Sequence, residues 1–439
     1  MKYYPTRSKL DLELGLKYYV TNNKHYIQGI IRAKPEDFIV KEVIPPGIVL
    51  EWNTQRLGGE GDYILILLEK RNIDHWTTLK LLSDTFKLKI DDINAIGIKD
   101  TKAITYQMIS IPKTIVTTQL SYDDIIIIAP SRDKQVRLRK IGEAVNPLKP
   151  GLNIGNKFNI KISGAKNIDK LQLILEELKY RNNTLLAYYM YQRFGTIRPN
   201  THKIGQKILE EKWQDAVIEA TATPYPKEST YIKKLRAAIR EAIEEENITK
   251  ILKIANKIPE SLWIEKKILK ELGKTKLNYY LAIKKLPTKI LKIYIQAYLS
   301  YLYNLYISKR VEEAEENRVL IGEYLVDMKT GAIREAKSER RIKEHERILL
   351  VIPPAKTNRI WRNIPNIDIE KLKAKLKEAY KKLNIKVRYI MRPLTTKAKI
   401  EKISVNNDIK ISFTMEKGQY ATLLLRELLK PVDPPEQGF

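Results

Sequence analysis

The sequence predicts an α+β fold, in which a domain built on a mixed or antiparallel sheet is interrupted by a mainly helical α+β insertion. Residues 27–163 have mainly the apolar patterns of strands, residues 213–359 are rich in Lys and Glu at helical spacing, and strand patterns return at residues 400–415. A pattern that returns after an interruption indicates a split domain. We expect the split domain at residues 1–211 and 363–439 and the insertion at residues 212–362.

In the first part of the split domain, strands outnumber helices, which favours antiparallel pairing over a doubly wound sheet. Apolar residues alternate around Phe38 and Val40, and a continuous apolar run at residues 63–69 predicts a buried strand. Further strands are expected at residues 108–111, 125–129 and 158–162, and helices at residues 76–88 and 171–181.

The insertion and the end of the chain follow the same rules. We expect a charged helix at residues 227–246, a buried Tyr-rich helix at 287–307 and short strands within 319–328 and 346–354. After Pro365, a basic helix that runs to about Leu383 is predicted from a stripe of Leu372, Leu376, Ala379 and Leu383. Strands at 400–405 and 409–415 and a helix at 420–429 complete the expected elements.

The charge of the chain indicates a polyanionic partner. Lys and Arg number 80 against 52 Asp and Glu, a formal net charge of +28 over 439 residues. Such a surplus opposes compactness through self-repulsion unless a polyanion balances it. Nucleic acid is favoured over a membrane surface, because no basic helix carries a lipid-seeking aromatic face. The composition identifies no obligate protein partner.

Several classes of site are excluded by the residues present. The chain has no cysteine, and its four histidines are scattered without an i, i+4 pair, so no metal site is expected. No G-x-x-x-x-G-K-[ST] or G-x-G-x-x-G motif occurs, so no cofactor is expected. The longest uncharged run, residues 293–308, is too short to span a bilayer, and no apolar signal core begins the sequence. We therefore expect a cytoplasmic protein.

The segment Gly97-Ile-Lys-Asp100-Thr-Lys-Ala-Ile-Thr-Tyr-Gln107 is the strongest candidate site. It places Asp100 in a tight loop between two apolar segments, with Lys99 and Lys102 beside it. By itself, the pattern fits a turn aspartate that hydrogen-bonds its own backbone. The chemical alternative is a carboxylate that basic neighbours keep ionised, available as a nucleophile or a base.

That segment resembles the G-x-K-D-x-x-A-x-T-x-Q loop of the TruD family of tRNA pseudouridine synthases, in which the aspartate is catalytic. Three further stretches, residues 32–42, 188–195 and 417–427, are similar to the family's P-E-D-F-x-V-x-E, N-Y-F-G-x-Q-R-F-G and G-x-[FY]-A-T-x-x-x-R-E motifs, in the same order. The resemblance is clear over residues 29–210 and 405–428. It implies the pseudouridine synthase fold, with a TruD-type insertion.

The third motif departs from the family pattern. Ala187 and Tyr189 stand where the family has Asn and Phe, and Met190 replaces a Gly. The family Asn contacts substrate, and Ala187 cannot make that contact, although Asn182 or Asn183 could replace it. These departures are expected to leave the type of reaction unchanged and to affect its rate and the uridine that is used.

The resemblance also implies roles for individual residues. Asp100 is the catalytic residue, which attacks the flipped nucleotide or removes a sugar proton. Arg32, which matches a basic position of the family, is the candidate for the nearby cation, and Lys99, although adjacent in sequence, can point away. Phe38, otherwise a core residue of its strand, is expected against the flipped uracil, with Tyr420 on or near another face.

Supporting roles are expected for five more residues. Gln192 and Arg193 shape the pocket, unless Arg193 contacts a phosphate; Glu42 orients the loop or pairs with a lysine; and Thr105 and Gln107 brace the loop. The basic helix at residues 371–388 is either a solvated face or a phosphate contact.

The function that follows is the conversion of a uridine to pseudouridine in tRNA or another structured RNA. The family's usual target is position 13 of tRNA, and some archaeal and eukaryotic members modify position 35 of tRNA-Tyr precursors. The alternative is a non-catalytic RNA-binding or RNA-chaperone protein on the same scaffold, which the altered Ala187 and Tyr189 would favour.

Overall fold

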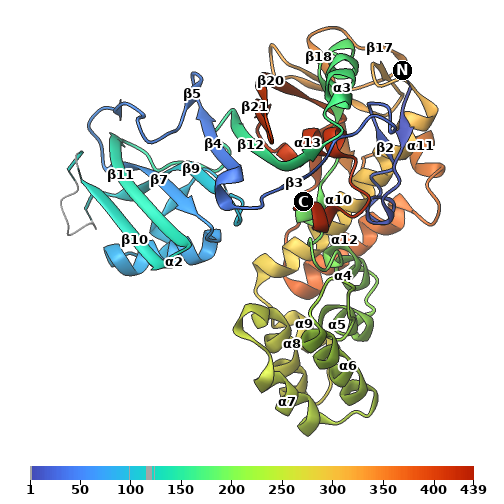
Figure 1. The fold of residues 1–439 in the computed structure, drawn as a ribbon. Helices are drawn as coiled ribbons and strands as arrows, with labels where there is room; N and C mark the ends of the chain where they lie inside the picture. Colours follow the sequence, from blue (N-terminus) through green and yellow to red (C-terminus); the bar gives the residue numbers. More distant parts are fainter. Residues whose placement is uncertain (1, 98, 115–120, 123) are drawn as a thin grey trace. The chain divides into compact units, whose positions relative to one another are not determined.

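The chain folds into two compact units (Figure 1). The computed structural model describes residues 2–97, 99–114, 121–122 and 124–439. One unit, the sheet unit, comprises Val20–Leu185 and Thr396–Phe439, and the other, the helix-rich unit, comprises Met1–Tyr19 and Leu186–Thr395. Each unit is therefore assembled from two separate stretches of the chain.

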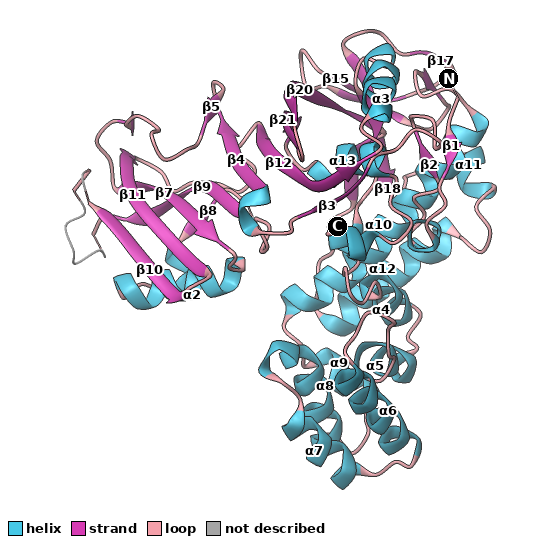
Figure 2. Cartoon of the chain, in the orientation of Figure 1, coloured by secondary structure: helices cyan, strands magenta, loops and turns pink. Residues whose placement is uncertain are grey.

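The sheet unit is built on one 13-stranded sheet, whose main path runs β10-β11-β7-β9-β4-β12-β21-β20-β13 (Figure 2). β3, β5, β6 and β8 pair with β12, β4, β11 and β9 off this path. The strands are β3 Gln28–Ile31, β4 Phe38–Ile44, β5 Ile48–Val49, β6 Leu57–Gly58, β7 Tyr63–Arg71, β8 Asn94–Ala95, β9 Ile104–Pro112, β10 Ile125–Ser131, β11 Lys134–Ala144, β12 Gly155–Lys166, β13 Thr184–Leu186, β20 Thr395–Val405 and β21 Ile409–Glu416.

The sheet is mixed. β4 and β9 run parallel, as do β6 and β11, whereas β7, β12 and β21 pair with their neighbours in antiparallel fashion. The helices of this unit are α2 His75–Phe86, α3 Asp169–Tyr180 and α13 Ala421–Leu429, with the short helices η1 Pro35–Asp37, η2 Ile90–Asp92 and η5 Pro434–Gln437. The predicted α+β class with a mixed sheet is confirmed.

The central strand β7 is buried on both faces, which explains its continuous apolar run. Ile64, Ile66 and Leu68 pack with Leu79 and Leu82 of α2. On the other face, a second buried cluster is formed by Leu65, Leu67, Met108 and Ile141. Both clusters hold β7 and β9 in register at the end of the sheet that carries the candidate loop.

The helix-rich unit contains most of the helices. They are α1 Lys9–Glu13, η3 Tyr191–Arg193, α4 Thr201–Leu209, α5 Trp213–Thr221, α6 Thr230–Glu244, α7 Ile248–Lys257, η4 Glu260–Leu262, α8 Trp263–Lys274, α9 Tyr279–Lys284, α10 Thr288–Glu313, α11 Arg359–Arg362 and α12 Ile369–Leu383. Its strands are β1 Tyr4–Pro5, β2 Tyr18–Tyr19, β14 Arg318–Val319, β15 Tyr324–Asp327, β16 Ile333–Glu335, β17 Arg340–Arg341, β18 Glu346–Ile352 and β19 Ile390–Pro393.

The long helix α10 is the core of this unit, as the sequence predicts. α4 packs closely against α10 at Gly205. A Cβ atom at this position would lie 2.0 Å from the Tyr294 carbonyl oxygen, so only glycine fits there. The basic helix α12 buries the predicted stripe of Leu372, Leu376, Ala379 and Leu383. In the part of the chain that the structure describes, no helix is long and apolar enough to cross a membrane.

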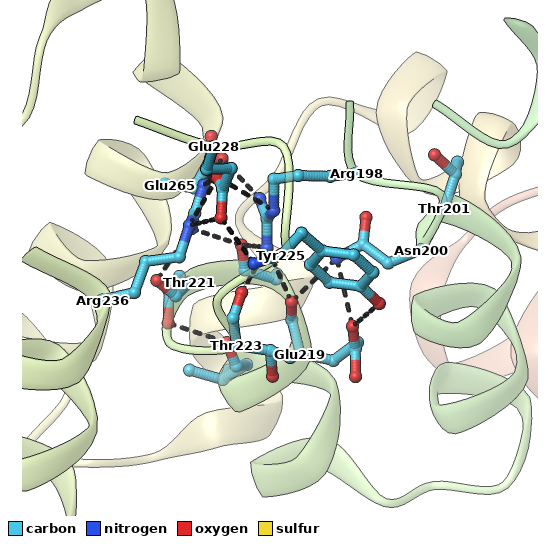
Figure 3. A network of polar contacts seen from close by, with 12 residues as sticks. Arg198, Asn200, Thr201, Glu219, Thr221, Thr223, Tyr225, Glu228, Arg236 and Glu265 are labelled. Carbon is cyan, nitrogen blue, oxygen red and sulfur yellow. Dashed lines mark hydrogen bonds and ion pairs between the residues drawn. The ribbon is translucent and has the colours of Figure 1, made fainter. Parts of the chain in front are cut away.

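A buried charge network ties α5, α6 and α8 together (Figure 3). Arg236, only 2% exposed, contacts Glu228 at 2.7 Å and Glu265 at 3.3 Å, and donates to the Thr221 carbonyl at 2.9 Å. Arg198 reaches the same Glu265 at 2.9 Å. Burial, followed by the charge of Arg236, lowers the pKa of Arg198. Because each buried guanidinium has a carboxylate partner, the network can persist in the interior.

The boundaries of the compact units differ from those expected for the domains. The units meet at residues 19/20, 185/186 and 395/396, whereas the sequence places the split domain at residues 1–211 and 363–439. The compact units are defined by which residues pack together, whereas the expected domains are defined by the sequence pattern and the family resemblance. The division into catalytic domain and insertion therefore stays a prediction.

Candidate active site

Asp100 and Arg32 form the centre of the candidate site in the sheet unit. The Arg32 Nη2 atom lies 3.4 Å from the Asp100 Oδ1 atom. The Asp100 side chain is 35% exposed, whereas that of Arg32 is 8% exposed. Burial lowers the pKa of Arg32, and the Asp100 charge opposes that shift. A solvent-accessible carboxylate therefore faces a buried cation, as the resemblance implies.

Arg32 is held in place by its backbone and by Phe38. Its φ of 56° lies in the left-handed region, which side-chain-bearing residues seldom adopt. The guanidinium carbon lies 3.7 Å from the centre of the Phe38 ring, and Nη1 donates to the Gly438 carbonyl at 3.2 Å. The Phe38 ring is fully buried and packs edge-on against Phe158. Its burial is that of a core residue, and its contact with a base stays a prediction.

Lys99 points away from the Asp100 carboxylate and into the protein. Its Nζ atom lies 2.8 Å from Glu42 Oε1 and donates to Asn156 Oδ1 at 2.6 Å. Glu42 also accepts from the Met108 amide at 3.1 Å. Burial raises the pKa of Glu42, and the charge of Lys99 opposes that shift. Glu42 thus pairs with a lysine of the loop, and Arg32, not Lys99, is the cation beside Asp100.

Lys70 of β7 is a neighbour of Asp100 that the sequence analysis missed. Its side chain is almost fully buried, and Nζ donates to the carbonyl oxygens of Ile73, Lys99 and Asp100 at 2.9, 3.1 and 2.6 Å. The signal in the sequence was a lysine at the end of a buried strand, a position that lysine seldom occupies.

Thr105 and Gln107 lie on β9, next to β7. Their side chains are fully buried, and neither the Thr105 hydroxyl nor the Gln107 amide hydrogen-bonds to another residue within the described chain. Thr105 pairs with Lys70 across the two strands, so both side chains are on one face of the sheet. Their expected role as braces of the loop stays a prediction. Ile98, within the loop itself, lies outside the described residues.

Tyr420 belongs to the sheet unit, at the residue that precedes α13, and is partly buried. Gln192 and Arg193 are in η3, in the helix-rich unit. Arg193 Nε donates to Ser300 of α10 at 3.0 Å. The contacts described for Arg193 are therefore with its own unit, and its predicted roles in the pocket or at a phosphate stay open.

The departures from the third motif lie in the same part of the helix-rich unit. Ala187 is fully buried, and its carbonyl accepts from Arg392 Nε at 2.9 Å. The Tyr189 ring lies 4.5 Å below the Arg392 guanidinium, and its backbone amide donates to Asn304 at 2.8 Å. Asn182 and Asn183, the suggested replacements, both have left-handed backbones and line a separate pocket of the sheet unit.

A groove of about 880 Å³ lies on the sheet unit beside η1. Its cationic lining residues are Lys34, Arg71, Lys161, Lys402 and Lys410, and its acidic ones are Glu36 and Asp37. Glu36 pairs with Arg71, and Asp37 lies 3.9 Å from Lys161. Lys34, Lys402 and Lys410 form no ion pair with any residue that the structure describes. The groove therefore carries an unbalanced positive charge.

The groove and the Asp100–Arg32 pair lie near the same end of the sheet. Ile39, which lines the groove, follows Phe38, and the side chains of successive strand residues point to opposite faces. Arg32 packs on the Phe38 side. The groove and the Asp100–Arg32 pair therefore lie on opposite faces of the sheet at β4.

These residues can perform nucleophilic or acid–base chemistry with a carboxylate. No group of three or more His, Cys, Asp or Glu suited to holding a metal ion occurs among the described residues.

Comparison with known proteins gives a consistent result. The family model for tRNA pseudouridine synthase D (TruD) matches residues 13–428. The chain is 30% identical to a protein of Pyrobaculum islandicum described as a probable tRNA pseudouridine synthase D, over 98% of both chains. It is 29% identical to a protein of Saccharolobus solfataricus with the same description, over 97% of this chain and 98% of that one.

A solved structure is similar over nearly the same extent. The crystal structure of a protein from Methanosarcina mazei, described as a putative tRNA pseudouridine synthase D, has a TM-score of 0.66 and 22% sequence identity. It covers 97% of this chain, and this chain covers 98% of it. At that identity, the likeness supports the fold.

Proposed function

Because the chain belongs to the tRNA pseudouridine synthase D (TruD) family, we propose that it isomerises a uridine of tRNA to pseudouridine, with Asp100 as the catalytic carboxylate. The pair formed by Asp100 and Arg32 at 3.4 Å is the observation that supports this assignment best. None of the comparisons supports the alternative of a non-catalytic RNA-binding protein.

The reaction requires the target uridine to leave its stack, since its sugar and base edges are covered in a helix. Asp100 then attacks the nucleotide or removes a sugar proton, and both routes require an ionised carboxylate. The bond between N1 and the sugar breaks, the uracil turns, and C5 forms the new bond to the sugar. The C5 proton is then lost and N1 takes up a proton, so the product is an isomer of the substrate. If Asp100 attacks the sugar, its bond to the sugar breaks as the bond to C5 forms; if it removes a sugar proton, that proton is returned to the sugar.

Arg32 has two tasks in this proposal. Its Nη2 atom faces the Asp100 carboxylate at 3.4 Å, and its guanidinium covers the Phe38 ring at 3.7 Å. While that stack is closed, Phe38 acts through Arg32. Direct contact between Phe38 and the uracil requires Arg32 to shift, whereas Tyr420 offers a second ring for the base.

The groove beside η1 is proposed to bind the phosphate backbone of the tRNA. Lys34, Lys402 and Lys410 line this groove and form no ion pair with a described carboxylate. Contacts to phosphates fix the register of a bound RNA without reading its sequence. The exposed lysines of α12 are a second candidate surface for such contacts. We further propose that the protein acts in the cytoplasm and needs no metal or organic cofactor.

The finer proposal concerns the target, which we expect to be position 13 of tRNA. Incubating the purified protein with a full set of unmodified tRNA transcripts and mapping pseudouridine at single-nucleotide resolution tests it. A single new pseudouridine at position 13 is the expected result. Modification only at position 35 of a tRNA-Tyr precursor would correct the target, and no modification of any transcript would overturn the proposed activity.

A further inference from the structure

Lys70 uses its ammonium group in an unusual way. The Nζ atom of a protonated lysine carries three donors, and Lys70 directs them at three carbonyl oxygens, those of Ile73, Lys99 and Asp100. Its side chain is 1% exposed. The ion pairs of the described residues do not include Lys70, so its charge is stabilised by backbone dipoles and by more distant carboxylates.

Burying this ammonium group is unfavourable. Burial lowers the pKa of Lys70 to about 8, with the charges of Asp100 and Asp74 opposing the shift and that of Lys99 adding to it. A methionine would fill the same space without a charge to desolvate, but it would leave the carbonyl oxygens of Ile73, Lys99 and Asp100 without this donor. What the lysine adds is therefore a fixed position for these three carbonyls.

The two loop carbonyls that Lys70 holds are those on either side of the Asp100 Cα atom. The Lys99 carbonyl belongs to the peptide plane before Asp100, and the Asp100 carbonyl belongs to the plane after it. The orientations of these two planes define φ and ψ of Asp100, because the peptide units are themselves rigid. Fixing both planes fixes the direction in which the Asp100 side chain leaves the backbone.

We propose that Lys70 is a positioning residue, which holds the peptide planes on both sides of Asp100 so that its carboxylate faces Arg32 and the substrate. The third contact, to the Ile73 carbonyl, anchors this clamp in the turn between β7 and α2. The inference rests on the proposed catalytic role of Asp100. A displacement of a reacting group by about 1 Å can cost about a hundredfold in rate, so such a clamp affects turnover directly.

The test compares Lys70→Met with the wild type in single-turnover reactions on one tRNA. The rate constant for the chemical step should fall about a hundredfold or more, while the Kd for tRNA stays within about twofold. Lys70→Gln keeps two N–H donors without the charge, and we expect its rate to lie between those of the other two proteins. The exposed Lys80 of α2 provides the matched control, Lys80→Met, whose rate should be unchanged.

A double variant separates positioning from stability. If Lys70 acts through Asp100, then adding Lys70→Met to Asp100→Asn should produce no further loss of the residual rate. A Lys70→Met protein with a lower melting temperature but an unchanged rate at a temperature where it is folded would overturn the proposal. If that variant does not fold, the same comparison made with Lys70→Gln decides the question.

Failure of the proposed function would look different. A wild-type protein that forms no pseudouridine in any tRNA would remove the reaction itself. An active wild type, an inactive Asp100→Asn variant and a fully active Lys70→Met variant would remove only the positioning role.

Discussion

The Arg32 guanidinium lies over the Phe38 ring, with its central carbon 3.7 Å from the ring centre. Cation–π contacts of desolvated groups are worth about 2 kcal/mol, and the Arg32 side chain is 8% exposed. Phe38 thus stabilises the position of the cation that faces Asp100. A change in the ring should therefore reach Asp100 through Arg32.

Phe38→Leu should lower the rate of pseudouridine formation at least tenfold while changing stability little. Leucine fills most of the ring's volume, and volume-conserving core changes usually cost less than about 1.5 kcal/mol. The ring face below Arg32 would be lost. Single-turnover rates and thermal melts of the same preparations measure the two effects separately.

Phe413→Leu is the matched control, because Phe413 is equally buried and stacks on Phe158, 5.2 Å between ring centres, in the same aromatic cluster. It should reproduce the change in stability and leave the rate nearly unaltered. Equal rate losses in both variants would assign Phe38 to the core alone. Phe38→Ala is a poorer test, since large-to-small core changes cost about 3–5 kcal/mol.

Much of the fold could be predicted, because the spacing of apolar residues indicates which side chains of a helix or strand are buried on one face. The spacing at residues 76–88 and 171–181 gave α2 and α3 to within a few residues, and the Tyr-rich segment gave α10. Strand order could not be predicted in this way. β4 pairs with β9 in parallel and with β12 in antiparallel fashion, and no local pattern distinguishes such partners.

The site was less predictable than the fold. Lys99 and Lys102 flank Asp100 in sequence, and only the family resemblance indicated that Arg32, 68 positions away, is the cation beside its carboxylate. In an irregular loop, neighbours in sequence have no fixed direction, so the inward turn of Lys99 toward Glu42 could not be inferred. Lys70 was missed because lysine is almost never fully buried, so a lysine at the end of a buried strand was not considered as a group inside the protein.

Binding of tRNA should weaken steeply with salt. If six or more phosphates are neutralised, affinity should fall about a thousandfold or more between about 50 and about 200 mM salt. Replacing Lys402 and Lys410 of the groove with Gln should lower the slope of log K against log salt by about one per lysine. Filter binding across a salt series measures this, with Lys80→Gln as the control. An unchanged slope in the double variant would place the RNA elsewhere.

Activity should survive removal of metal ions. The proposed chemistry uses a carboxylate and the substrate's own atoms, and the described residues hold no metal-binding cluster. Dialysis against EDTA followed by assay in metal-free buffer should leave the single-turnover rate within about twofold, provided that the tRNA is folded beforehand. Activity that returns only on addition of zinc would contradict a cofactor-independent mechanism.

Arg236→Met should destabilise the helix-rich unit. Removing one member of a buried ion pair costs about 3–5 kcal/mol, because it leaves the partner charge unpaired, and here both Glu228 and Glu265 lose a contact. Arg240, on the same helix, is 41% exposed, and its ion pair with Glu244 is long, with 4.0 Å between nitrogen and oxygen. Arg240→Met should therefore change stability by less than about 1 kcal/mol. Denaturant unfolding of both variants provides the measurement, and equal effects would show that the network in Figure 3 contributes little.

Asp100→Asn separates an enzyme from a binding protein on the same scaffold. Asparagine keeps the size of the side chain and most of its hydrogen bonds but removes the negative charge. An amide can neither attack the nucleotide nor accept a proton, so the rate of pseudouridine formation should fall to a small residual value. Binding of tRNA should persist or tighten slightly, because one negative charge that faces a polyanion is gone.

The loop geometry makes this substitution informative. Asn serves as well as Asp in most turns. In addition, Lys70 donates a hydrogen bond to the backbone carbonyl of residue Asp100, and the substitution leaves that carbonyl in place. The loop should therefore keep its conformation, and a loss of activity would report the missing charge. One tRNA, the two proteins, filter binding and pseudouridine mapping suffice. Full activity in the Asn variant would exclude Asp100 as the catalyst, and loss of activity together with loss of binding would point to a damaged site.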